Sequence, residues 1–147
     1  MSFSVGDIPF FKEYQFTDTG KTAPHFGLVL LPENATKYTS SVLCCVITSQ
    51  QPNRKKWSLL LRCSCYSCFA NDSYACFDRK DLVSKNGLGN DPQPRAKLDK
   101  GDLSKAYKIL RGSLFAIKDL ANDPYMRGVI IYEWKKALGI SIEDLIK

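Results

Sequence analysis

The stretch VLCCVITS, from Val42 to Ser49, most constrains how this chain can fold. It is a short apolar run, rich in β-branched residues, that passes abruptly into hydroxyl side chains and the polar segment 50–56. Such a run predicts a central strand that is buried on both faces. Thr48 and Ser49 are candidates for chemistry, because strand ends are held by the sheet and open to solvent at its rim. The alternative is that both hydroxyls only terminate the strand, as turn residues often do.

The rest of the chain predicts strands first and helices afterwards. Four further apolar runs bounded by turn residues predict strands at 5–11, 26–31, 57–63 and 73–77. Segment 12–24 is predicted to be a long exposed loop, and segment 78–83 a single helical turn. Apolar residues at helical spacing predict helices at 103–117, 126–138 and 140–146. This order predicts a single α+β domain over 1–147, a small antiparallel barrel or sheet with the C-terminal helices packed on it.

The charge of the chain favours a polyanionic partner or a strongly acidic protein. Lys and Arg number 21 against 15 Asp and Glu, which gives a net charge of +6. The densest basic segment is 54–56, which has a solvated turn as its alternative interpretation. The sequence has no apolar stretch of the roughly 20 residues that span a bilayer and no secretory signal pattern. We therefore expect a cytoplasmic protein that does not enter a membrane.

Cysteines at 63, 65, 68 and 76 could supply the four thiolates of a zinc site. Their spacing is loose, however, and Cys44 and Cys45 lie within an apolar run, where cysteine behaves as a small apolar residue. In the cytoplasm thiols stay reduced. We therefore expect reduced, metal-free cysteines, with zinc as the alternative. No cofactor is expected, because the sequence has no phosphate-binding glycine loop and no H-E-x-x-H pair.

His25 is the only histidine of the chain, and it directly precedes the predicted strand 26–31. If that strand pairs in antiparallel fashion with 42–49, His25 comes close to Thr48. An imidazole, a hydroxyl and nearby cations would suit phosphodiester chemistry on RNA, which supplies its own 2′-OH nucleophile. The alternative is a purely structural histidine.

Five segments together resemble the PemK/MazF toxin family, and they occur in the family's order. They are Gly6-Asp7-Ile8, His25 to Leu30, Val46 to Ser49, Ser73 to Asp78 and Lys97 to Leu110. The resemblance implies a small SH3-like antiparallel β-barrel, of the CcdB/PemK type, over 1–118 together with the first long helix, and a helical extension over 119–147. It also implies a metal-independent endoribonuclease that cleaves single-stranded RNA by 2′-OH attack. The implied partners are a second copy of the chain, in a homodimer, and a cognate antitoxin protein.

The same resemblance implies roles for individual residues. Thr48 falls on the family's catalytic threonine, and His25 falls on the position of its phosphate-binding arginine, with Phe26 in place of the following proline. His25 and Thr48 are therefore the expected catalytic residues. Ser49 is expected to bind substrate, and the missing positive charge is expected from Lys21, Arg54 or Arg79. The alternative is a binding module that has lost catalysis and grips a protein or a nucleic acid.

Overall fold

A computed structural model of the protein describes residues 3–35, 40–119, 121 and 123–140. The strands are β1 (Asp7–Ile8), β2 (Phe10–Gln15), β3 (Thr22–Leu31), β4 (Ser41–Thr48), β5 (Ser58–Leu61), β6 (Ser73–Ser84) and β7 (Ala96–Lys97). The α-helices are α1 (Lys100–Ala116) and α2 (Pro124–Ala137), and the short 3-10 helices are η1 (Glu33–Ala35), η2 (Lys55–Trp57) and η3 (Lys85–Leu88). Strands thus precede helices, and the predicted α+β class is confirmed.

The five longer strands form one antiparallel sheet in the order β2-β3-β4-β6-β5, and β1 pairs with β7 in a separate two-stranded sheet. β4 is the central strand, as predicted, with residues 42–47 buried. Its side chains alternate between two apolar clusters: Val42, Cys44 and Val46 face one, and Leu43, Cys45 and Ile47 face the other. Both cysteines of the run thus serve as apolar core residues. Among the described strands, β2 and β5 remain edges, so the pairing does not close into a barrel.

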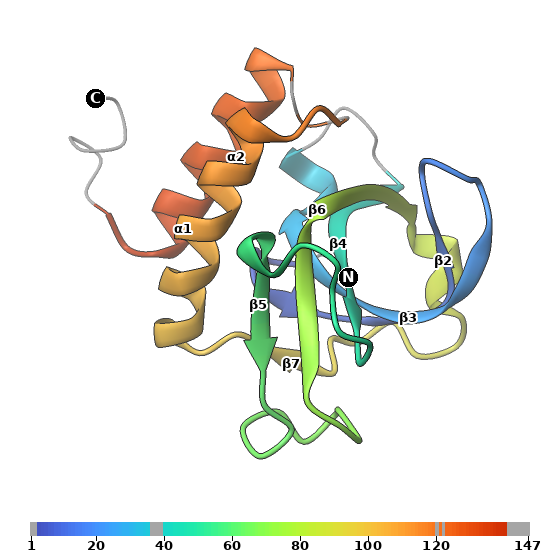
Figure 1. Cartoon of the computed structure of the whole chain (residues 1–147). Coiled ribbons are helices and arrows are strands. Elements are labelled where there is room, and N and C mark those ends of the chain that lie inside the picture. The colour runs from blue at the N-terminus through green and yellow to red at the C-terminus, as the bar shows by residue number, and fades with distance from the viewer. Residues whose placement is uncertain (1–2, 36–39, 120, 122, 141–147) are drawn as a thin grey trace.

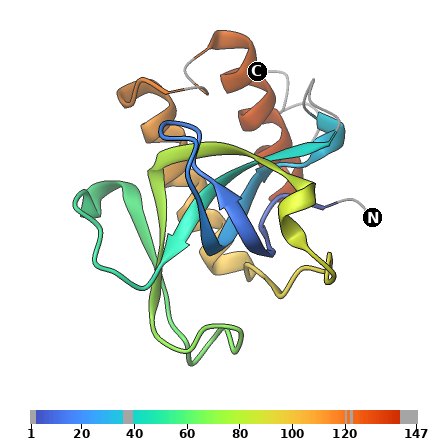
Figure 2. The same ribbon diagram turned by 90° about the vertical axis from the view of Figure 1, so that its right-hand side faces the viewer.

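The large sheet is strongly curled, and side chains connect strands that are not neighbours in it (Figure 2). The buried Tyr14 hydroxyl of β2 donates to Asp81 Oδ2 of β6 at 2.8 Å. The Thr17 N–H donates to Asp81 Oδ1 at 2.9 Å, and the Leu82 N–H donates to Thr17 Oγ1 at 3.0 Å. The curl encloses the smaller apolar cluster, to which Phe11, Tyr14 and Val83 belong.

The two α-helices lie side by side at the side of the molecule opposite β2 (Figure 1). Asp99 caps α1 by accepting from the Asp102 N–H at 2.7 Å, and Asp123, followed by Pro124, caps α2 by accepting from the Met126 N–H at 3.0 Å. Trp134 of α2 is fully buried and donates its indole N–H to the Leu30 carbonyl at 2.9 Å. Burying such a side chain contributes about 1.5 to 3 kcal/mol. Among the described residues, neither α1 nor α2 has the length and apolar composition that a membrane-spanning helix requires.

Three predicted elements differ from the structure. The long loop predicted at 12–24 is wrong, because β2 and β3 form a hairpin with a turn at 16–21. The helical turn predicted at 78–83 is also wrong, because this segment continues β6 and pairs with β4, as in Val42 with Val83. The strand predicted at 5–11 is divided at Pro9 into β1 and β2. The third helix, predicted at 140–146, lies outside the described residues apart from Ile140.

Candidate functional site

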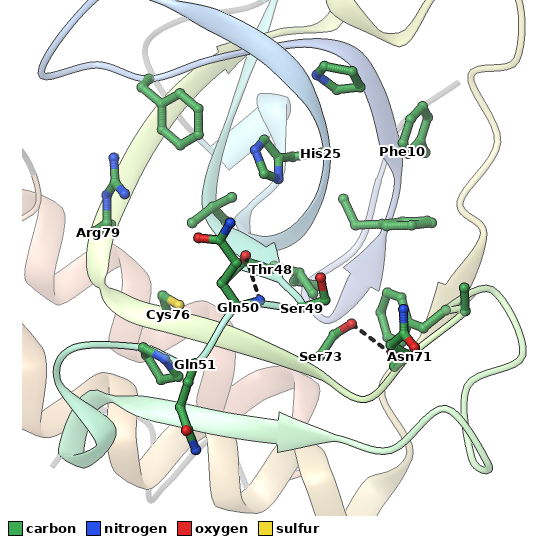
Figure 3. Close-up of a pocket in the computed structure, with 18 of the residues that line it drawn as sticks. Phe10, His25, Thr48, Ser49, Gln50, Gln51, Asn71, Ser73, Cys76 and Arg79 are labelled. Carbon is green, nitrogen blue, oxygen red and sulfur yellow. Dashed lines mark hydrogen bonds between the residues drawn. The ribbon is translucent and has the colours of Figure 1, made fainter.

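A cavity of about 630 Å³ opens beside the end of β4 (Figure 3). Its walls come from β2, β3, β4 with the loop that follows it, the β5–β6 loop and β6. Four of the predicted site residues line it, namely His25, Thr48, Ser49 and Arg79. The His25 ring lies near Thr48, and Arg79 approaches from β6 (Figure 3). The cavity therefore gathers an imidazole, two hydroxyls and a guanidinium from three strands and one loop.

The strand register explains why these side chains meet. β3 and β4 are antiparallel and pair Phe26 with Ile47, so His25 and Thr48 are the next residues outward on the two strands. The structure thus supports the predicted proximity of this pair. Arg79 comes from an irregular part of β6, where the register with β4 shifts between Cys45 and Ile47. Such a bulge re-aims side chains, and here it turns Arg79 toward the cavity.

His25 is half-buried, and its surroundings favour the neutral imidazole. Burial lowers the pKa of His25 below its usual value of 6.5, a hydrogen bond with the Ile47 backbone opposes this shift, and repulsion by the Arg79 cation adds to it. The ring also packs against two aromatic rings, those of Phe16 and Tyr14, at centroid distances of 5.5 and 6.3 Å. A neutral imidazole fixed in this way can accept a proton near pH 7.

Arg79 is the one Lys or Arg side chain among the described residues that line this cavity. Its guanidinium lies over the Phe16 ring, 4.9 Å from the centroid, and 3.9 Å from Asp18 Oδ2. The two charged side chains are 48% and 66% exposed, so water screens their attraction. Arg79 is therefore oriented by Phe16 but is not neutralised by a buried partner, and it can turn to an anion in the cavity.

The Thr48 hydroxyl is held by the loop that follows β4. Its oxygen accepts a hydrogen bond from the Gln50 N–H at 3.1 Å (Figure 3). The oxygen is thus engaged as an acceptor, and the hydroxyl proton remains available to a group in the cavity. Cys76 also lines the cavity, but burial raises its pKa to about 11. This thiol is protonated at neutral pH and does not serve as a nucleophile.

Sequence reasoning missed two groups of side chains that line the cavity. The aromatic group is Phe10, Phe16, Phe26 and Phe69, and the amide group is Gln50, Gln51, Asn53 and Asn71. Phe26 contacts Phe10 and Phe69 edge to face, each at a centroid distance of 5.0 Å. The run QQPN after the central strand, with three amides in four residues, was the available signal for the second group.

The β5–β6 loop, 62–72, extends beyond the ends of the two strands that it joins (Figure 2). Its residues Phe69 and Asn71 line the cavity. Tyr66 anchors this loop to α1: its hydroxyl donates to Asp102 Oδ2 at 2.6 Å and accepts from the Asp99 N–H at 3.2 Å. Within the described residues, no group of three or more His, Cys, Asp or Glu side chains could hold a metal. The zinc alternative therefore has no ligand set in this part of the chain.

Two predicted substrate-binding residues lie outside the cavity. Lys21 is exposed at the end of the β2–β3 turn, and Arg54 lies in the β4–β5 loop, where it lines a second cavity. Position along the sequence could not reveal this separation, because it depends on how the loops turn.

The chain matches no protein-family model and no curated protein. A function is therefore inferred from the geometry of the site and from the sequence motifs.

Proposed function

We propose that the chain is a metal-independent endoribonuclease that cleaves single-stranded RNA by 2′-OH attack, with the first cavity as its active site. The observation that carries this proposal is the convergence of His25, Thr48 and Arg79, from three different strands, on one cavity. The resemblance of five segments to PemK/MazF toxins supports it, and so does the net charge of +6. On this proposal the curled sheet corresponds to an SH3-like barrel that stays open between its edge strands β2 and β5. The protein is then a cytoplasmic toxin that forms a homodimer and is held inactive by an antitoxin.

The residues of the cavity can divide the work of the reaction. Neutral His25 takes the proton of the 2′-OH, whose oxygen attacks phosphorus while the bond to the 5′-oxygen breaks. The Ile47 backbone engages one ring nitrogen, so the other nitrogen accepts this proton. Arg79 stabilises the negative charge that builds up on the phosphate oxygens, and the Thr48 hydroxyl donates a hydrogen bond to one of them. The 5′-oxygen takes a proton from water, and the hydroxide formed removes the proton from His25. The products are a 2′,3′-cyclic phosphate, a 5′-hydroxyl end and a neutral imidazole.

The remaining lining residues favour single-stranded RNA as the substrate. Unpaired bases bind proteins by stacking on aromatic rings and by hydrogen bonds along their edges. The rings of Phe10, Phe16 and Phe26 and the amides of Gln50 and Asn71 supply both kinds of contact within one cavity. A base-paired duplex would present neither its base faces nor its Watson–Crick edges to these groups.

Cleavage of a long unstructured RNA in the presence of EDTA tests the proposal. We expect fragments with 5′-hydroxyl ends from the parent protein, and a loss of at least about 100-fold in rate for His25→Ala, which removes the base. Thr48→Val keeps the branched shape of the side chain and removes only the hydroxyl, and it should slow cleavage as well. Lys105→Ala, on the exposed face of α1, is the matched control and should cut like the parent.

Two results would contradict the proposal. One is the absence of fragments from the parent, and the other is cleavage by His25→Ala at the parent's rate. Tight RNA binding without any cleavage would favour the binding module instead. The reason for this alternative is His25, which stands where the family has its phosphate-binding arginine. A stoichiometric protein partner other than an antitoxin, recovered from the native host, would favour the same alternative.

A further inference from the structure

A second cavity of about 500 Å³ lies next to the first. Its lining residues are Asn53, Arg54, Asp78, Ala116, Ile117 and Lys118. Two of them, Asn53 and Asp78, also line the first cavity, so the two cavities share a wall. A strand of RNA that leaves the first cavity over Asn53 and Asp78 therefore enters the second.

η2 packs against α1 next to this second cavity, between the two segments, 53–54 and 116–118, that line it. Gly112 of α1 faces Trp57 of η2 so closely that a Cβ atom at Gly112 would lie 3.0 Å from Trp57 Cζ3. The glycine thus allows the indole to lie against the helix. Arg54 is the N-cap residue of η2, and Lys118 follows the end of α1. The close contact therefore brings two cations from distant parts of the sequence to one cavity.

The charges of the second cavity suit a phosphate. Arg54 and Lys118 are exposed, and within the described residues neither forms a salt bridge. Asp78, on the shared wall, is the one acidic side chain among the lining residues, so cations outnumber anions there. A guanidinium and an ammonium that are not engaged by carboxylates can both contact the oxygens of a phosphodiester.

We propose that Arg54 and Lys118 form a second phosphate subsite, which binds the backbone of the RNA strand beyond the nucleotides held in the first cavity. This inference rests on the proposed function, because it places the same substrate across both cavities. It also gives Arg54 a role that its position outside the first cavity does not supply. Oligonucleotides long enough to span both cavities should then bind more tightly than those that fill only the first.

The test compares a dinucleotide with a twelve-nucleotide RNA, both carrying 2′-fluoro groups so that no 2′-OH can attack. Affinity is measured by fluorescence anisotropy between about 50 and about 200 mM salt. The plot of log K against log salt has a negative slope. The loss of one phosphate contact on a single strand should make this slope shallower by about 0.7. For the long RNA, raising the salt over this range weakens binding by both proteins. The loss of affinity of the double variant Arg54→Gln/Lys118→Gln should be about 2.6-fold smaller than the loss of the parent. Its affinity for the dinucleotide should equal that of the parent.

The double variant Lys100→Gln/Lys105→Gln is the matched control. It removes the same charge from exposed positions in the first turns of α1, at the opposite end of the helix from Lys118. An unchanged slope for Arg54→Gln/Lys118→Gln would overturn the inference, and so would an equal effect of the control or an equal loss for the dinucleotide. Each of these results leaves the first cavity's function standing. A parent that binds neither oligonucleotide would overturn the proposed function and this inference together.

Discussion

Replacing Tyr14 by Phe should destabilise the protein through one atom. The Tyr14 hydroxyl is buried and donates to Asp81 Oδ2 at 2.8 Å, which ties β2 to β6 across the curl of the sheet. A hydrogen bond to a charged group contributes about 1.5 to 3 kcal/mol, and the phenylalanine ring preserves the packing on Phe11. We therefore expect the free energy of unfolding to fall by about 1.5 to 3 kcal/mol at pH 7. The melting temperature should drop by about 5 to 10 °C.

The loss should depend on pH with a definite sign. Burial raises the pKa of Asp81, and hydrogen bonds from the Thr17 N–H and the Tyr14 hydroxyl oppose this shift. Removing the hydroxyl raises the folded-state pKa further, so the variant binds its proton more readily when folded. The variant's deficit should consequently be largest at neutral pH and shrink toward the value of a neutral hydrogen bond, about 0.5 to 1.5 kcal/mol, as Asp81 becomes protonated in acid.

Urea unfolding followed by circular dichroism from pH 4 to pH 7 measures both effects. Tyr125→Phe is the matched control, because it deletes the same atom from a tyrosine of α2 that is 73% exposed, and it should change stability by less than about 0.5 kcal/mol. A Tyr14→Phe midpoint equal to that of the control at pH 7 would refute the reasoning. A deficit that grows in acid would refute the role of the Asp81 charge.

Two further predictions concern the base and the packing of β2. In a profile of kcat/KM against pH, cleavage should fall as the pH drops through the lowered pKa of His25, below 6.5, and stay level above it. Arg79→Gln removes a charge that repels the imidazolium, so it should shift this fall in activity to higher pH. A fall at the same pH in the variant and the parent would show that Arg79 does not influence the pKa of His25. Gly87→Ala should cost about 1 to 3 kcal/mol in urea unfolding, because the added Cβ would lie 2.3 Å from the Glu13 carbonyl oxygen; an unchanged midpoint would show that η3 moves away freely.

The elements that could be predicted from the sequence are those with a local signal. The central strand follows from apolar residues on both faces of β4, and both helices follow from apolar residues at helical spacing. The second half of β6 has no such signal, because it buries Lys80 and Asp81. Their partners are far away in sequence: Lys80 pairs with Asp119 at 2.8 Å, and Asp81 pairs with Tyr14. Because an unpaired charge is costly to bury, a charged segment is predicted to be exposed when its partners are not known.

The second part of β2, from Lys12 to Gln15, was missed for a different reason. Its pairing with β3 shifts between Phe11 and Tyr14, so two exposed residues, Lys12 and Glu13, separate two buried ones. This bulge interrupts the alternation that identifies a strand in a sequence. The hairpin turn that follows needs Gly20, whose φ of +72° lies in the left-handed region. The loop prediction at 12–24 thus identified the turn residues correctly but extended them over both strands.

For the site, sheet geometry predicted more than composition did. The proximity of His25 and Thr48 followed from one antiparallel pairing, which needs no knowledge of loops. Lys21, Arg54 and Arg79 were equal candidates for the missing cation, and only the bulge in β6 brings Arg79 to the first cavity. Phe69 was missed because its position depends on the β5–β6 loop, which Tyr66 anchors to α1 through a contact that no local sequence pattern indicates.

On the proposed function, the replacement of an arginine by His25 and the position of Arg79 form one arrangement. A guanidinium at position 25 would bind phosphate but could not exchange a proton near neutral pH. With an imidazole there, the phosphate needs its cation from elsewhere, and Arg79 supplies one from β6. Burial lowers the pKa of His25, and repulsion by the same cation adds to this shift, so the base stays unprotonated. The positive charges that bind the RNA strand are then those of Arg79 in the first cavity and of Arg54 and Lys118 in the second. The group that faces the 2′-OH nucleophile is the neutral imidazole of His25.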